Sequence, residues 1–328
     1  MFCIVWYHIL AYYLYVYPHN SLNDFIIEAA IPSLHIGVIL FVLISGFYGI
    51  KPSLKGLAKL LTIIIVYFLP LQFVQLVIEG RLSHPRAIMN SLMFITNTPY
   101  WFIRTYIYLY LCTPFINAYI NSSNKKQLNC LLIVLGIIAV YFGTTKGDPS
   151  LGDGKNLVNF IFLYLLGHTL KLYLSQLLKI KKVYYLIVFL FLNIGLMTSL
   201  LIFPHDTFVG NEIWELSFPY CSPFLIINAT LLFVIFSGMS FYSKGINTIA
   251  SSMFAVYLIH SHPIIMQVYQ PKLCEWLYTS PTTTFVNSIA ITILIMLISV
   301  TIDKMLTPIW RIKDIVFINI QNRFEHNK

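Results

Sequence analysis

The sequence has 328 residues, of which 58% are hydrophobic and 10% charged, and its formal net charge is +9. A soluble domain carries about a quarter charged residues and a disordered chain is poor in hydrophobic residues, so the composition excludes both classes. In so apolar a chain, excess Lys and Arg are typical of the cytoplasmic loops of a membrane protein rather than of nucleic-acid binding. We therefore expect an all-α polytopic membrane protein with no nucleic-acid partner.

Apolar runs of about 20 residues, the length that crosses a bilayer, predict ten transmembrane helices. The connections between them are short and leave no room for a separate soluble domain. We expect one transmembrane domain over residues 1–306 and a cytoplasmic tail over 307–328. In chain order the ten runs are residues 2–17, 27–50, 57–78, 100–120, 128–145, 157–174, 183–203, 219–239, 251–269 and 285–306.

The basic residues predict the orientation. Fifteen of the 21 Lys and Arg residues fall in or beside the turns that follow the second, fourth, sixth and eighth spans, or in the C-terminal tail. Five fall in the loops on the opposite side, and Arg104 lies inside a span. The positive-inside rule counts Lys and Arg, so the rich side is expected to be cytoplasmic, together with both termini. The fifteen are Lys51, Lys55, Lys59, Lys125, Lys126, Lys171, Lys179, Lys181, Lys182, Lys244, Lys304, Arg311, Lys313, Arg323 and Lys328.

The two ends of the chain each allow two interpretations. The first run spans about 24 Å at 1.5 Å per residue, less than a 30 Å hydrocarbon core, so we expect the natural helix to extend upstream. A short tilted helix in thinned membrane is the alternative. Near the other end, Thr307 to Ile320 mixes apolar and basic residues; this pattern favours either a helix lying on anionic lipid or a fraying tail.

The five cysteines predict no metal site, because they lack the paired spacing of zinc ligands. Cys3, Cys112 and Cys130 fall in or beside apolar runs, where they are expected to pack as small hydrophobic residues. Cys221 and Cys274 map near the same face, and a disulfide between them is the less favoured alternative.

Histidines in or at the edge of the predicted spans are the first candidates for chemistry. His8, His35 and His260 lie there, with His168 and His262 ranked next. Polar groups that persist in hydrocarbon are functional candidates, and His is the commonest general base. The alternative for any one of them is an interhelical hydrogen bond.

The second span ends in small residues and is followed by lysines. Ser45-Gly46 would let a neighbouring helix backbone approach closely. Lys51, Lys55 and Lys59 follow at four-residue spacing, which places them on one side of a helix, where they could hold phosphate. The alternative is that they set topology and touch lipid headgroups, and for Lys51 we prefer it.

Arg104 and two polar loops complete the candidates. Arg104 is about one turn inside the fourth span, where it either snorkels to the surface or faces a polar cavity and binds an oxyanion. The loops 79–99 and 203–218 combine acidic, basic and aromatic residues that suit sugar hydroxyls, but such residues are also ordinary in loops. The sequence contains none of the motifs of P-loop ATPases, zinc proteases or α/β-hydrolases.

Five stretches together resemble the motifs of one family. Through these stretches and their order along the chain, the sequence is similar to the acyltransferase-3 family of bacterial inner-membrane enzymes, which O-acylate cell-surface glycans. The stretches are Cys3-Ile-Val-Trp-Tyr-His8, Ile39-Leu-Phe-Val-Leu-Ile-Ser45-Gly46-Phe47, Trp101-Phe102 through Tyr110 to Pro114, Phe162-Leu-Tyr-Leu-Leu-Gly167 and Ser252-Met-Phe-Ala-Val-Tyr257-Leu-Ile-His260.

The resemblance implies a catalytic His in the first span, which here is His8. It also implies an acyl-CoA donor on the cytoplasmic side and a glycan acceptor outside. The sequence departs from the family at two places. It has no position for the Arg that usually precedes the His by about ten residues. Lys55 and Lys59 stand where the family tends to have paired arginines, and Lys lacks the bidentate fork of Arg.

We therefore expect a multi-pass O-acyltransferase of the bacterial inner membrane, in particular an O-acetyltransferase. Its partners would be acyl-CoA, a cell-surface glycan or lipid-linked sugar acceptor, and membrane lipid, with no tightly bound cofactor. His8 would act as the base, Arg104, His35 and His260 would orient groups or stabilise charge, and Lys55, Lys59 and Ser45 would bind the donor. The alternative is a transporter or flippase for a lipid-linked glycan, which would show internal repeats; residues 1–150 and 151–328 show no such pairing.

Overall fold

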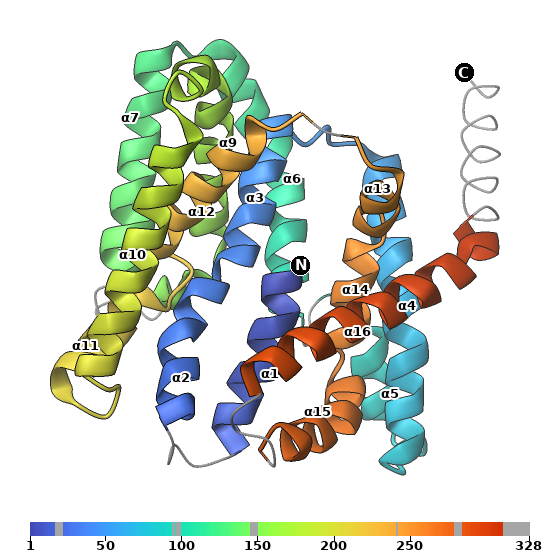
Figure 1. The fold of residues 1–328 in the computed structure, drawn as a ribbon. Helices are drawn as coiled ribbons and strands as arrows, with labels where there is room; N and C mark the ends of the chain where they lie inside the picture. The colour runs from blue at the N-terminus through green and yellow to red at the C-terminus, as the bar shows by residue number, and fades with distance from the viewer. Residues whose placement is uncertain are drawn as a thin grey trace, which may run out of the picture.

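A computed structural model describes residues 1–16, 22–93, 95, 100–144, 150–240, 242–278 and 284–310, and this part of the chain is helical without strands (Figure 1). The α-helices are α1 (Phe2–Val16), α2 (Leu22–Leu34), α3 (Ile36–Tyr48), α4 (Leu54–Ile78), α5 (Pro85–Leu92), α6 (Trp101–Ser122), α7 (Lys125–Gly136), α8 (Phe142–Thr144), α9 (Leu157–Leu177), α10 (Lys182–Ile202), α11 (Phe208–Ser217), α12 (Pro223–Ser237), α13 (Lys244–Ala250), α14 (Met253–His260), α15 (Pro263–Tyr278) and α16 (Thr284–Met305). A π-helical segment, Ile137–Tyr141, joins α7 to α8, and a short 3₁₀ turn, Gly152–Gly154, precedes α9.

The protein is a helical membrane protein, but the predicted count of ten spans is not confirmed. Within the described residues, six helices are long and apolar enough to cross a bilayer, and α1 and α12 are shorter apolar helices of 15 residues each. The 22-residue α6 is long enough, but its tyrosines and asparagines make it more polar. Two of the six join successive elements: Asp24–Tyr48 runs through α2 and α3, and Lys125–Thr144 runs from α7 through the π-helical segment to α8. The other four are Leu54–Ile78, Leu157–Leu177, Lys182–Ile202 and Thr284–Met305.

Two of the predicted runs are interrupted, and one of the interruptions directly precedes a proline. Residues 251–269 were predicted as one helix, but Ser261 and His262 separate α14 from α15, which starts at Pro263. Proline lacks a backbone N–H and disfavours helical backbone at the residue before it. Pro32 lies near the end of α2, and His35 is the turn residue between α2 and α3.

The tightest helix crossing joins α3 to α9. A Cβ atom added to Gly46 would lie 2.0 Å from the backbone oxygen of Tyr164, and one added to Gly167 would lie 2.2 Å from that of Leu43. Both positions therefore require glycine, and the predicted close approach at Ser45-Gly46 is confirmed. Buried apolar side chains, including Leu43 and Leu163, surround the crossing.

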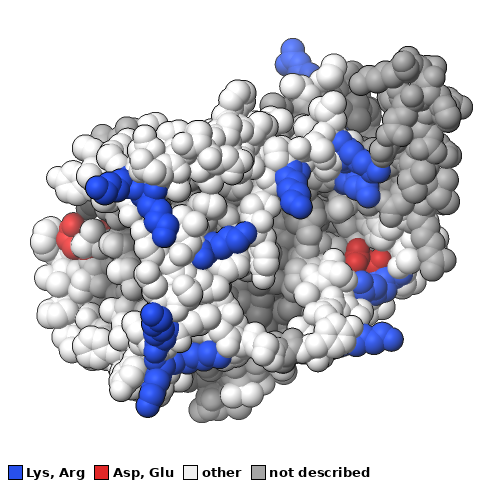
Figure 2. Space-filling model, turned by 90° about the horizontal axis from the view of Figure 1, so that it is seen from above, with Lys and Arg blue, Asp and Glu red and all other residues white. Residues whose placement is uncertain are grey.

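Basic side chains gather at one end of the bundle. The ends of α3, α6, α9 and α12 and the starts of α4, α7, α10 and α13 meet there (Figure 1), and Figure 2 shows the Lys and Arg side chains distributed over this face. We call it the lysine face. The turns and helix starts at this end carry Lys51, Lys55, Lys59, Lys125, Lys126, Lys179, Lys181, Lys182 and Lys244.

Two of the predictions fall wholly or partly outside the described residues. The helix expected over 307–320 is described only for residues 307–310, which are helical, and Trp310 packs on Tyr67 with ring centroids 5.8 Å apart. The side chain of Cys274 is not among those described, whereas Cys221 is a buried free thiol.

Candidate functional site

Two of the predicted histidines meet inside the bundle. His8 lies on α1 and His260 is the last residue of α14, and Nδ1 of His8 is 3.1 Å from Nε2 of His260. The His260 side chain is fully buried and His8 is partly buried. These residues are 252 positions apart in the chain, so the fold, rather than local sequence, brings them together.

The hydrogen bonds around this pair define where its protons lie. Nδ1 of His260 is 2.6 Å from the carbonyl oxygen of Val256; since a carbonyl only accepts, this nitrogen carries the hydrogen. In neutral His260 the other nitrogen, Nε2, is then an acceptor, so the His8 Nδ1–H donates to it. The Ser261 hydroxyl is also 3.1 Å from this Nε2. Neutral His8 is therefore left with an unprotonated Nε2, which is the nitrogen that a general base requires.

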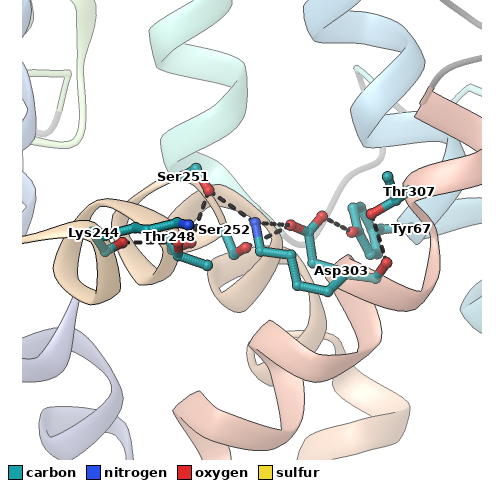
Figure 3. A network of polar contacts seen from close by, with 8 residues as sticks. Tyr67, Lys244, Thr248, Ser251, Ser252, Asp303 and Thr307 are labelled. Atoms are coloured by element: carbon teal, nitrogen blue, oxygen red, sulfur yellow. Dashed lines mark hydrogen bonds and ion pairs between the residues drawn. The ribbon is translucent and has the colours of Figure 1, made fainter.

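A polar network holds the start of α14 in place. The Ser252 hydroxyl, just before α14, donates to the Asp303 carboxylate of α16 at 2.6 Å, and the Tyr67 hydroxyl of α4 donates to the same carboxylate at 2.5 Å (Figure 3). Lys304 pairs with Asp303 at 3.8 Å and donates to the hydroxyl of Ser251 at 2.9 Å. Three helices thus converge on one carboxylate, which fixes the helix that carries His260.

A similar contact fixes α1. Trp6 lies two residues before His8, and its indole N–H donates to the Ser288 hydroxyl of α16 at 2.8 Å. Because α16 anchors both α1 and α14, it sets the separation of the two histidines.

An apolar cavity of about 220 Å³ lies between the pair and the lysine face. Ile4, one turn before His8, and Tyr257, three residues before His260, form part of its wall. The ring centroids of Tyr257 and His260 are 6.1 Å apart. Towards the lysine face the cavity is bordered by Ser45 near the end of α3 and Leu60 near the start of α4.

Of the three predicted donor-binding residues, Ser45 lines this cavity, and Lys55 and Lys59 lie outside its wall. Ser45 donates to the Phe41 carbonyl oxygen at 2.9 Å and is 3.1 Å from the Tyr106 hydroxyl, both of which are also in the cavity wall. Lys59 immediately precedes Leu60, and Lys55 lies one turn earlier on α4. The Ser53 hydroxyl caps this helix by accepting from the Gly56 N–H at 2.9 Å. The cap fixes the start of α4, just before Lys55.

His35 lies near His8 without touching it. Its ring stacks on Phe218 and Tyr220, with centroids 4.2 and 4.4 Å apart, and Nδ1–H donates to the Phe218 carbonyl oxygen at 2.9 Å. The Tyr7 ring packs against both histidines; its centroid is 4.3 Å from that of His35 and 5.4 Å from that of His8. His35 therefore joins an aromatic cluster next to the pair.

The structure does not bring Arg104 to the histidine pair. Arg104 is partly exposed on α6, between the buried residues Ile103 and Thr105. Its guanidinium makes no hydrogen bond or ion pair with the part of the chain that the structure describes. This position is compatible with snorkelling to the surface.

Three residues of the site were not among the sequence candidates. The Val256 carbonyl, Ser261 and Asp303 carry the hydrogen bonds that orient His260 and its helix. Asp303 is the one acidic residue in the final apolar run, and the cost of charge in hydrocarbon would have identified it. A backbone carbonyl has no such signal in the sequence.

Comparison with known proteins identifies the family. A family model described as an acyltransferase domain matches residues 1–304. Neither the curated proteins nor the solved structures gave a match. The match covers nearly the whole chain, and it includes both helices that carry the histidine pair. The chain therefore belongs to the acyltransferase-3 family.

Proposed function

We propose that this acyltransferase moves an acyl group, in particular acetyl, from acyl-CoA to a hydroxyl of a cell-surface glycan or lipid-linked sugar. The observation that carries the proposal is the chain of hydrogen bonds from His8 through His260 to the Val256 carbonyl. It holds a basic nitrogen inside a membrane protein, about one helical turn from Ile4 and Tyr257 in the wall of an apolar cavity. Acyl transfer to an alcohol requires such a base, because the hydroxyl must lose its proton as it attacks.

In the proposed reaction the acceptor oxygen forms a bond to the thioester carbonyl carbon. Nε2 of His8 takes the hydroxyl proton, and the Nδ1–H bond to His260 stabilises the resulting imidazolium. When the tetrahedral intermediate collapses, the C–S bond breaks and the thiolate of CoA takes the proton back from His8. The ester and free CoA leave, and the base is regenerated. Arg104 and His35 have no step in this scheme, because neither contacts the pair.

The donor would enter from the lysine face, which we propose is cytoplasmic in a bacterial inner membrane. Lys55 and Lys59 would attract the phosphates of CoA. The apolar cavity would take the acyl group and the adjoining part of the pantetheine arm. Its wall includes Leu60, the residue after Lys59, and Ile4 and Tyr257, which precede His8 and His260 by about one turn. Two helices support this arrangement. On α4 the lysines precede Leu60 of the cavity wall, and on α1 Ile4 of the cavity wall precedes His8.

Label transfer tests the proposal. Membranes containing the protein would be supplied with acetyl-CoA labelled in the acetyl group, and radioactivity in extracted glycan would be measured. We expect His8→Ala to abolish transfer while leaving the amount of folded protein unchanged. His205→Ala is the matched control, because this exposed histidine contacts the Trp214 ring, away from the pair. Label transfer by His8→Ala at the wild-type rate would remove His8 from the mechanism, and absence of transfer by the wild type would favour a transporter.

A further inference from the structure

A polar pocket of about 340 Å³ is lined by residues of α4, of α5 and of the connection between them. Helix α5 and the end of α4 lie at the end of the bundle opposite the lysine face (Figure 1). Gln72 of α4, Arg81 of the connection, and Asn90 and Ser91 of α5 supply its polar wall. We call it the α4–α5 pocket. Its volume is in the range of small-molecule sites, and it lies at the end opposite the one through which the proposed function has the donor enter.

An apolar groove of about 230 Å³ adjoins this pocket and shares Gln72, Leu76 and Ser91 with it. The amphipathic helix α5 divides the two: Ala87 and Asn90 line the pocket, whereas Ile88 and Leu92 line the groove. The groove is completed by Leu69, Phe73 and Leu82. A ligand that filled both spaces would need a polar part and a hydrocarbon part joined directly.

The polar groups in and beside the α4–α5 pocket suit hydroxyls better than a bare anion. The Arg81 guanidinium is 3.3 Å from the Glu79 carboxylate, and the other oxygen of that carboxylate accepts from Gln75 at 2.7 Å. The cation is thus paired, and the remaining lining groups are amides and a hydroxyl, which both donate and accept. A sugar, whose hydroxyls also donate and accept, matches this set.

The wall of the α4–α5 pocket contacts His262, which follows the histidine pair in the chain. Phe68 lines the pocket, and its ring centroid is 5.6 Å from that of His262, two residues after His260. His262 is fully buried; its Nδ1 accepts from the Ile264 N–H at 3.3 Å, so a neutral ring carries its hydrogen on Nε2. This Nε2 has no partner among the described residues. A buried unpaired N–H is destabilising, and an acceptor oxygen brought beside it would remove that penalty.

We infer that the acceptor is a lipid-linked sugar, with its sugar in the α4–α5 pocket and its hydrocarbon chain in the adjoining groove. This inference rests on the proposed function and narrows its two acceptor classes to one. A free polysaccharide would leave the groove without a ligand, because it has no hydrocarbon part. Phe68, in the wall of the α4–α5 pocket, and His262 pack between this pocket and the histidine pair.

Photo-crosslinking of the full chain in lipid nanodiscs tests the inference. The probes are alkyl glucoside, galactoside and N-acetylglucosaminide that carry a diazirine in the alkyl chain, with labelled peptides identified by mass spectrometry. We expect label within residues 69–92. An alkyl glycoside should compete at a concentration about tenfold lower than an alcohol of the same chain length, as one or two hydrogen bonds to the sugar would give.

Variants and competitors make the result decisive. Asn90→Leu should reduce labelling about tenfold, whereas Val77→Ala should not, because exposed Val77 lines neither space. Equal competition by the alcohol would identify an ordinary lipid groove and overturn the inference, as would competition by free sugar alone or the absence of label from residues 69–92. Labelling should persist in His8→Ala, because binding does not need the base. If the wild type were labelled but transferred no acyl group, the proposed function would be contradicted and the binding site would stand.

Discussion

The α3–α9 crossing and the α1–α14 contact both join helices inside the bundle, but they are built from different chemistry. At the crossing, Gly46 and Gly167 bring two backbones together and apolar side chains fill the surroundings. At the α1–α14 contact, His8 and His260 meet through ring nitrogens. The first contact resembles the small-residue packing by which membrane helices associate. The second places ionisable groups where hydrocarbon makes them expensive.

The difference separates what holds the protein together from what it does. Interhelical hydrogen bonds in membranes contribute on average about 0.6 kcal/mol, so the histidine pair adds little stability for the cost of burying it. A function explains its presence better than packing does. The comparison therefore makes opposite predictions for the two contacts: changes at the crossing should affect folding, and changes at the pair should affect activity.

The largest effect is expected from Gly46→Ala. The added methyl would lie 2.0 Å from the Tyr164 backbone oxygen, and backbone cannot rotate away as a side chain can. We expect the free energy of unfolding to fall by about 3 kcal/mol, near the upper end of the cost of overpacking a core. The measurement is the thermal unfolding midpoint of detergent-solubilised protein.

Gly195→Ala is the matched control for the crossing. It adds the same methyl within helix α10, where nothing lies within 4 Å of the new atom. Its helix should be unchanged or stabilised by about 0.5–1 kcal/mol, because alanine favours helix over glycine. Equal destabilisation by both substitutions would show that the crossing is not the tight contact that the geometry describes.

At the pair, His260→Ala should slow acyl transfer about 10²-fold, equivalent to about 2.7 kcal/mol. Without the acceptor at Nε2, the His8 Nδ1–H loses its partner, and the tautomer and ring orientation of His8 are no longer fixed. The effect should appear in kcat, with the KM for acyl-CoA and the unfolding midpoint nearly unchanged. Initial rates over a range of acyl-CoA concentrations measure this.

His260→Gln distinguishes positioning from bulk. The side-chain oxygen of glutamine can accept the His8 N–H, so this variant should recover part of the rate that alanine loses. His168→Ala, which removes a partly buried histidine on α9, serves as the control and should leave kcat unchanged. A loss of kcat that is equal for His260→Ala and His260→Gln would contradict the hydrogen-bonding role.

The sequence was sufficient for the features that depend on composition and local pattern. The apolar runs predicted a helical membrane protein, the distribution of Lys and Arg over the turns predicted one basic end, and Ser45-Gly46 predicted a close helix contact. The family resemblance drew attention to His8. Each of these signals is contained in neighbouring residues, so no tertiary information was needed.

The rest depended on which distant residues meet. The pairing of His8 with His260 rather than with His35 or Arg104 is set by the breaks at His35 and at Ser261–His262, which redirect the helices. The number of spans was similarly uncertain from hydropathy, because α1 and α12 are short and α6 is rich in tyrosine. Orienting groups such as the Val256 carbonyl are invisible in sequence, since every residue has one.

The smallest effect is expected from replacing Lys55 and Lys59, which belong to neither contact, with glutamine. Loss of two charges near the CoA phosphates should raise the KM for acetyl-CoA about tenfold, with kcat and the unfolding midpoint unchanged, and the difference from wild type should shrink at high salt because screening weakens exposed charges. Lys125→Gln with Lys126→Gln removes the same charge from the start of α7, on the same face. If this control raised KM equally, the lysines would act through the general potential of the face. If neither double variant changed KM, the donor would be held by the apolar cavity alone, and the basic end would serve topology.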